Sequence, residues 1–406
     1  MNEPEQPDAA AIQRWIDKPY AVLDEAFSQG GQTVWQPGKQ LFLADGKVAQ
    51  AVLANKEGLF DDHSDFFFTG QGIYGPRSAQ VDISRGARKL LTHYLEANKD
   101  QLNHAIKQTF KGTSQWPDTG NWLMYHHFAD ALLHPDSPTG LRKLLNAVVK
   151  RNVLSGARMS YHQFSRTLFR HRLRLAMYRE IKRRRRQPPA EQPRDLLDIV
   201  ITVTGPDISI GQLNDIYFSF IFATAGSVGF MLGWSVYMLG THPKIAADPT
   251  IKPAWVVRET LRLWPVAWNL ARRPAQKQPL ADVTVTPQDL VVACPYAVHR
   301  NPDNWDDPNS FSPQRWDRRT KPEEKPEQKS AEVKDNTFIP FGYGQHICPA
   351  ANLSMQLVES ILIQLKPYQL TVKVTDSHLL ADAALAPPAF SLEVSKTLQS
   401  TDAAKQ

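Results

Sequence analysis

The chain has 406 residues, of which 42% are hydrophobic and 22% charged, so it can form large buried cores and is not of disordered composition. Its two cysteines, Cys294 and Cys348, are too few for a disulfide framework and favour a reducing compartment such as the cytoplasm. Much of the net charge of +6 lies in the tract 170–187, which could attract nucleic acid. No zinc-ligand spacing or aromatic stacking pattern accompanies the tract, so we interpret it as a solvated helix end and expect no nucleic-acid partner.

The first half of the chain is predicted to be mainly helical. Its polar, acidic start lacks the basic and apolar regions of a signal peptide, and we expect residues 1–15 to be flexible. Short apolar segments with the turns "PGK" and "ADGK" predict two strands and then a helix over 32–54. Apolar residues at helical spacing predict a helix over 84–110, and a mostly helical pattern continues over 120–186 with a break at "HPDSPTG".

The most apolar segment of the chain is 216–240, "IYFSFIFATAGSVGFMLGWSVYMLG". Ser, Thr and four Gly interrupt it, and no positive flank follows it, which is unlike a membrane span. We therefore predict a long buried helix and no membrane association.

The second half is predicted to alternate between helices and strands. The charged, proline-bearing segment 318–335 is expected to be an exposed loop, and residues 398–406 a flexible terminus. No clear linker divides the chain, so we expect one helix-dominated domain over 1–406. The other predicted elements are a helix over 254–265 ended by Pro265, two short strands within 278–300, a helix over 349–366, and a closing strand pair over 368–376 and 389–396.

A lone cysteine follows a glycine-punctuated turn in "FIPFGYGQHICPA", residues 338–350. A thiolate is a soft, electron-donating ligand for iron, and holding it requires backbone N–H groups directed at the sulfur. Gly342 and Gly344 permit such a tight turn, and Phe341 can shield the sulfur from water. A helix that begins near Cys348 would also favour the thiolate. The alternative is an inert buried cysteine, and the turn alone does not decide between the two.

The segment "FGYGQHICPA" resembles the cysteine loop of the cytochrome P-450 family, F-G-x-G-x-[HR]-x-C-x-G, with Ala350 in place of the last glycine. The resemblance implies a mainly α fold with small β-sheets, in which heme b (iron protoporphyrin IX) lies between the long central helix and the cysteine-loop helix. It also implies that Cys348 is the iron ligand, with Phe341 and Gly342 beside the cofactor.

Two further motifs of the same family occur in the expected order. "ETLRLWP" resembles the E-x-x-R helix and supplies Glu259 and Arg262, and "FSPQRW" supplies Arg315. In the family these three residues hold the cysteine loop. A carboxylate between two guanidinium groups makes charge-assisted hydrogen bonds, so we expect a structural role for them and no chemistry.

The two propionates of heme should attract cations. The resemblance places Arg272 and His346 at propionate-contacting positions. It also places Arg88 there, through the phrase [HW]-x-x-x-R, although Ser84 replaces the His or Trp. A surface helix arginine is the alternative interpretation of Arg88.

The family activates dioxygen beside a kinked helix with the motif A-G-x-[DE]-T, whose acid and alcohol hold water. An ungapped count back from "WSVYMLGTHP" places the motif on 223–227, with Gly226 at the acid position and Ser227 at the alcohol position. A second alignment, on 225–229, places Val228 and Gly229 there instead. Both alignments lack the acid. We predict that Thr224 and Ser227 hold water; the alternative is that their hydroxyls bond back to helix carbonyls.

The sequence therefore predicts a bacterial-type heme-thiolate monooxygenase of the cytoplasm that hydroxylates or epoxidises a hydrophobic or aromatic small molecule, as in secondary metabolism. Electrons would come from a separate ferredoxin and ferredoxin reductase, and a monomer is expected. Pocket residues are expected in 63–75, 218–229 and 266–270, which are largely aromatic and apolar. Because the acid is missing, peroxide-dependent oxidation, isomerisation or dehydration remains an alternative. A non-catalytic heme protein is a further one.

Overall fold

The computed structural model describes residues 9–28, 30–61, 65–154, 163–187, 192–317, 337–379 and 384–396. The predicted loop over 318–335 and the predicted flexible terminus over 398–406 lie outside these residues, as do residues 1–8 of the predicted flexible start. Residues 9–15 of that start are helical: they belong to α1 (Ala9–Asp17), where Trp15 packs edge-on against Phe42 with ring centroids 5.1 Å apart.

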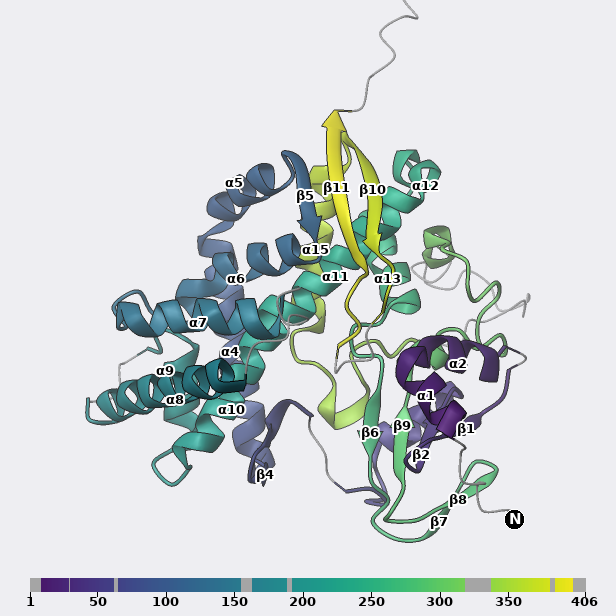
Figure 1. The fold of residues 1–406 in the computed structure, drawn as a ribbon, viewed down its shortest axis with the longest axis horizontal. Coiled ribbons are helices and arrows are strands. Elements are labelled where there is room, and N and C mark those ends of the chain that lie inside the picture. The colour runs from purple at the N-terminus through teal and green to yellow at the C-terminus, as the bar shows by residue number, and fades with distance from the viewer. Residues whose placement is uncertain are drawn as a thin grey trace, which may run out of the picture.

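Helices make up most of the described chain, and they gather on one side of the molecule with a smaller β-rich region beside them (Figure 1). The predicted helix over 84–110 is two helices that meet at Asn98, whose side-chain amide donates to the Tyr94 carbonyl oxygen. The helices before the central one are α2 (Pro19–Ala26), α3 (Gly46–Ala54), α4 (Arg77–Ala97), α5 (Lys99–Thr109), α6 (Asp118–Leu132), α7 (Thr139–Asn152), α8 (Gln163–Arg185) and α9 (Leu196–Thr204).

The apolar segment forms the central helix that crosses the middle of Figure 1. It begins as α10 (Ile210–Ile221) after a capping box in which Ser209 and Gln212 satisfy each other's backbone N–H groups. It then passes through one π-helical segment, Phe222–Ser227, and continues as α11 (Val228–Thr241). Within the described residues this helix is long and apolar enough to cross a membrane, but 67% of its most apolar window is buried inside the protein. The core helix of a folded domain has the same property.

The chain after the central helix carries the motifs of the candidate site. The segment 278–300, in which two strands were predicted, contains three: two form a hairpin, and the third, "LVVA", belongs to a different sheet. The elements are α12 (Pro243–Ala247), α13 (Pro253–Leu263), β6 (Leu270–Arg272), β7 (Gln278–Leu280), β8 (Val283–Val285), β9 (Leu290–Ala293), α14 (Pro295–Val298), α15 (Ala351–Leu365), β10 (Tyr368–Asp376) and β11 (Ala389–Lys396).

Two small sheets flank the helical body (Figure 1). In the first, β1 (Thr33–Gln36) pairs with β2 (Gln40–Leu43), and the order is β1-β2-β9-β6, in which β2 and β9 are parallel. In the second, the predicted closing pair β10 and β11 is antiparallel, and β11 also pairs with β5 (Gly112–Trp116). The sequence pattern did not predict β5, because only Trp116 is buried and the strand therefore lacks an alternation of apolar and polar residues. A two-stranded pair, β3 (Phe68–Thr69) and β4 (Gly72–Ile73), lies before α4.

Candidate active site

The cysteine loop is a compact turn that ends at the start of α15. Gly342 and Gly344 have φ angles of 78° and 72°, a backbone region that favours glycine. The Cys348 N–H donates to the Phe341 carbonyl oxygen at 2.9 Å, which closes the turn. The backbone N–H of Ala350 donates in turn to the Cys348 sulfur, while burial raises the pKa of that thiol. The loop thus presents its sulfur with one N–H directed at it.

Three neighbouring elements fix the outer side of this loop. A Cβ added at Gly344 would lie 2.8 Å from Ala54 Cα, so the loop backbone rests on the end of α3. Arg77, at the start of α4, donates to the Gln345 carbonyl oxygen. A Cβ added at Gly342 would lie 3.7 Å from Leu270 Cδ1, which places β6 against the turn.

Beneath the loop, α13 carries a fully buried carboxylate. Both Glu259 and Arg262 are 0% exposed, and Arg262 donates to the two carboxylate oxygens through Nε at 3.0 Å and Nη2 at 2.9 Å. Glu259 also accepts hydrogen bonds from Arg315 Nε, Trp316 Nε1 and the Ser312 N–H, at 2.9, 2.9 and 3.0 Å. Each carboxylate oxygen is therefore satisfied, as a buried charge requires.

A buried histidine links this network to the cysteine loop. His299 Nε2 lies 2.9 Å from the backbone N of Ile339, which must donate, so Nε2 is the acceptor. His299 Nδ1 lies 3.1 Å from the Arg262 carbonyl oxygen and must then carry the proton. The neutral imidazole of His299 therefore joins α13 to the segment that leads into the loop.

The central helix is distorted on the segment that the sequence predicted to activate oxygen. The Val228 N–H donates to the Ala223 carbonyl oxygen, five residues back, so the segment is wider than an α-helix. The side-chain amide of Asn121, on α6, donates to the carbonyl oxygens of Ala225 at 2.9 Å and Gly226 at 3.1 Å. The distortion thus has a specific partner on a neighbouring helix.

The two candidate hydroxyls of this segment differ from the others in the same helix. The hydroxyls of Ser219, Ser235 and Thr241 all donate to the carbonyl oxygen four residues back. Thr224 is buried and Ser227 is half-buried, and within the described part of the chain neither hydroxyl has a protein hydrogen-bond partner. Both hydroxyls therefore remain available to water or a ligand.

Comparison with known proteins agrees with this geometry. A sequence profile described as Cytochrome P-450 matches residues 254–384, from α13 through the cysteine loop to α15 and β10. The cyclooctat-9-en-7-ol 5-monooxygenase of Streptomyces melanosporofaciens is 28% identical over 210 residues, which is 45% of this chain and 43% of that relative. The chain spans less than half the length of the first curated relatives it matches.

Solved structures show the same fold over nearly the whole chain. The retinoic acid-bound cyanobacterial protein CYP120A1 superposes with a TM-score of 0.70 at 18% identity, over 92% of this chain and 93% of that one. A mutant of P-450 EryK in complex with erythromycin B superposes with a TM-score of 0.66 at 18% identity, over 95% of this chain and 99% of that one.

The chain belongs to the cytochrome P-450 family.

Cytochromes P-450 carry heme b, and the residues of this chain fit that cofactor. A thiolate ligand of iron is stabilised by a backbone N–H directed at its sulfur, and Cys348 has such an N–H, from Ala350. Of the cations predicted near the propionates, Arg272 is 5% exposed in β6, which packs against the loop, and His346 lies in the loop itself. Arg88 is exposed on α4 and, within the described chain, has no hydrogen bond or ion pair.

Some residues that hold the P-450 site were not predicted from the sequence. Arg77, His299 and Asn121 each connect the site to a distant part of the chain. Only His299 had a nearby signal, since it lies upstream of the "FSPQRW" motif that supplies Arg315. Arg77 and Asn121 stand in no recognisable motif, and their roles depend on tertiary contacts.

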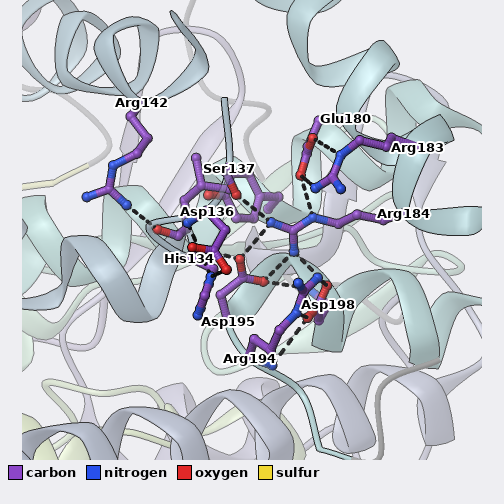
Figure 2. Close-up of polar contacts among 12 residues, drawn as sticks. His134, Asp136, Ser137, Arg142, Glu180, Arg183, Arg184, Arg194, Asp195 and Asp198 are labelled. Carbon is purple, nitrogen blue, oxygen red and sulfur yellow. Dashed lines mark hydrogen bonds and ion pairs between the residues drawn. The ribbon is translucent and has the colours of Figure 1, made fainter. Parts of the chain in front are cut away.

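Part of the basic tract forms ion pairs inside the protein, at the C-terminal end of the tract. Figure 2 shows the Arg184 guanidinium surrounded by Glu180, Asp195 and Ser137. Arg184 also bonds to Asp198, and its side chain is only 3% exposed. This end of α8 therefore anchors the helix to α9 and to the loop after α6, in keeping with a structural interpretation of the tract.

Proposed function

We propose that this P-450 is a heme-thiolate monooxygenase of the bacterial cytoplasm that inserts one atom of dioxygen into a hydrophobic small molecule. One substrate C–H bond, dioxygen, two electrons and two protons would give an alcohol and one water; an alkene would give an epoxide and one water. The observation that carries the proposal is the cysteine loop. The Ala350 N–H donates to the Cys348 sulfur, and His299 connects the segment before the loop to the helix that carries the buried Glu259–Arg262 pair.

Heme b, when bound, supplies the redox chemistry, and this chain's residues hold and orient it. We assign Cys348 as the iron ligand, with Phe341 and Gly342 in the turn beside it. The propionates would be neutralised by Arg272, by His346 and by the unpaired, exposed Arg88. We assign Glu259, Arg262 and Arg315 to holding the loop, because their polar groups are directed at one another, at backbone groups or at the Trp316 indole.

We assign proton delivery to the π-helical segment, through water held by the Ser227 and Thr224 hydroxyls. The distortion lies on 222–227, and regular α-helix resumes at Val228. A Cβ added at Gly229 would lie 2.4 Å from Asn121 Nδ2, so the second alignment puts its alcohol position where no alcohol side chain fits. Both observations support the alignment with Gly226 at the acid position. Without an acid there, water or a substrate hydroxyl must complete the relay.

The substrate is proposed to be hydrophobic, because aromatic side chains gather where the family binds substrate. Phe66 packs edge-on against Phe220 of α10 with centroids 4.5 Å apart. Phe68 and Phe222 remain 56% and 38% exposed, so both present apolar surface that a ligand could cover. The similarity to a monooxygenase named for cyclooctat-9-en-7-ol agrees with this class and with a setting in secondary metabolism. A separate ferredoxin and its reductase would supply electrons to the monomeric enzyme.

The alternative is heme-thiolate chemistry without dioxygen, favoured by the glycine at the acid position. The test is to incubate the holoprotein with a substrate found by spectral screening, surrogate redox partners and isotopically labelled dioxygen. The proposal expects the label in the product and no product without reductant. Product formed anaerobically, or only with added peroxide, would contradict it and favour the alternative.

A further inference from the structure

A cavity of about 270 Å³ opens between α6 and α7, lined by residues that have no part in the proposed active site. Pockets for drug-sized ligands are larger, ~300–1,000 Å³, so this cavity suits a small molecule. Its lining consists of Tyr125, His126, Ala129, Leu133, Pro135, Thr139, Arg142, Lys143, Leu145 and Asn146.

One wall of the cavity is the positive end of a helix. α7 begins at Thr139, no side chain caps its first N–H groups, and its first turn contains no acidic residue. The exposed N–H groups and the helix dipole at such an end favour an anion. Arg142 and Lys143 follow within the next turn and line the same cavity. The wall therefore combines two cations with unsatisfied backbone donors.

The two cations are held differently. Arg142 donates to the Asp130 carboxylate at 2.5 Å and to the Leu133 carbonyl oxygen at 2.7 Å, so its charge is partly balanced and its position is fixed (Figure 2 shows Arg142 beside the loop after α6). Lys143 is exposed and forms no ion pair with any residue in the described part of the chain. The charge of Lys143 is therefore available to a ligand.

A hydroxyl without a partner among the described residues, on an otherwise buried side chain, points independently to a ligand. Tyr125 is only 3% exposed, it lines the cavity, and no described residue forms a hydrogen bond with its hydroxyl. Buried tyrosine hydroxyls usually have a partner. Burial raises the pKa of Tyr125 to about 12, so the hydroxyl keeps its proton and acts as a donor at neutral pH.

The rest of the lining includes apolar side chains from both helices and the loop between them. They are Ala129, Leu133, Pro135 and Leu145, and they would exclude water from a short hydrocarbon body. We propose that this cavity binds a small organic acid, with the carboxylate between the α7 N-terminus, Lys143 and the Tyr125 hydroxyl, and the apolar body against these side chains.

The test uses the holoprotein and 4-fluorobenzoate, with binding followed by fluorine NMR. Tyr125→Phe removes only the hydroxyl and should weaken binding about tenfold or more, since a hydrogen bond to a charged group is lost. Lys143→Gln removes one exposed charge and should weaken binding about fivefold. Lys150→Gln, an exposed residue on the same helix outside the cavity, is the matched control and should bind as the unaltered protein does.

The neutral analogue 4-fluorobenzyl alcohol separates this site from a general apolar pocket. It should bind more weakly than the acid and should lose little affinity in Lys143→Gln. The absence of saturable 4-fluorobenzoate binding at millimolar concentration would overturn the proposal. Equal 4-fluorobenzoate affinity of Lys143→Gln and Lys150→Gln would also overturn it. Because both lysines are exposed, these two variants should fold normally, so the comparison remains valid even if Tyr125→Phe folds poorly.

Discussion

Removing the carboxylate of Glu259 tests the buried hydrogen-bond network beneath the cysteine loop. This side chain accepts two hydrogen bonds from Arg262 and one each from Arg315, Trp316 and the Ser312 N–H. Arg262 is 0% exposed, so Glu259→Ala would leave its guanidinium in the core without a counter-charge. We expect a large loss of stability and little heme-loaded protein.

The magnitude follows from the burial of both partners. Breaking a buried ion pair by removing one partner costs about 3–5 kcal/mol. The orphaned N–H groups of Trp316 and Ser312 add to this, by up to ~1–3 kcal/mol each where they stay buried and unpaired. The whole free energy of unfolding of a protein is about 5–15 kcal/mol, so the substitution would remove a large fraction of it.

The assay is urea unfolding of the purified variant, together with the ratio of heme absorbance to protein absorbance. The matched control is Asp82→Ala, which breaks the exposed Asp82–Arg85 pair on α4 and should change the free energy of unfolding by less than about 1 kcal/mol. A Glu259→Ala variant that is heme-replete, with an unfolding midpoint close to that of the control, would refute the assigned structural role.

Three further predictions concern the proton relay, its support and the pH dependence of stability. Ser227→Ala should bind substrate normally yet divert reducing equivalents to hydrogen peroxide; unchanged product per NAD(P)H would contradict the relay. Asn121→Ala removes both hydrogen bonds to the π-helical carbonyls and should lower the free energy of unfolding by about 1–3 kcal/mol in urea titrations; a neutral effect would mean that these bonds do not support the distortion. Burial lowers the pKa of His127 from 6.5 to about 4, so between these values the unfolded chain binds a proton that the folded chain does not. The free energy of unfolding should therefore fall by on the order of 1–3 kcal/mol as the pH drops through this window, and a His127→Phe variant that keeps the same slope would contradict the assignment.

The sequence predicted the fold well where local pattern and tertiary packing agree. The helix over 254–265 was expected to end at Pro265 and does end at Leu263, because proline removes an N–H and disfavours helix in the residue before it. The closing pair β10 and β11 was visible because β-branched and aromatic residues alternate there. By contrast, the sequence did not predict the helix over 9–17, where Trp15 packs against Phe42, a contact that no local pattern reveals.

The candidate site was predictable to the extent that its residues stand in fixed local patterns. Glu259 and Arg262 are three residues apart on one helix face, so the sequence alone indicated their contact. The His299 link to Ile339 joins residues 40 positions apart, and Asn121 reaches a segment 104 positions away. Such contacts depend on how helices pack, and they carry no periodic signal.

The central claim is that Cys348 is the iron ligand, and the spectrum of the reduced, carbon monoxide-bound protein tests it most directly. Thiolate ligation should give the strongly red-shifted Soret band that is characteristic of the family, and Cys348→Ser should lose that band. Cys294→Ala is the control, since Cys294 is fully buried with its pKa raised to about 12, and it should keep the spectrum. A Cys348→Ser protein that retained the red-shifted band, or a Cys294→Ala protein that lost it, would contradict the account.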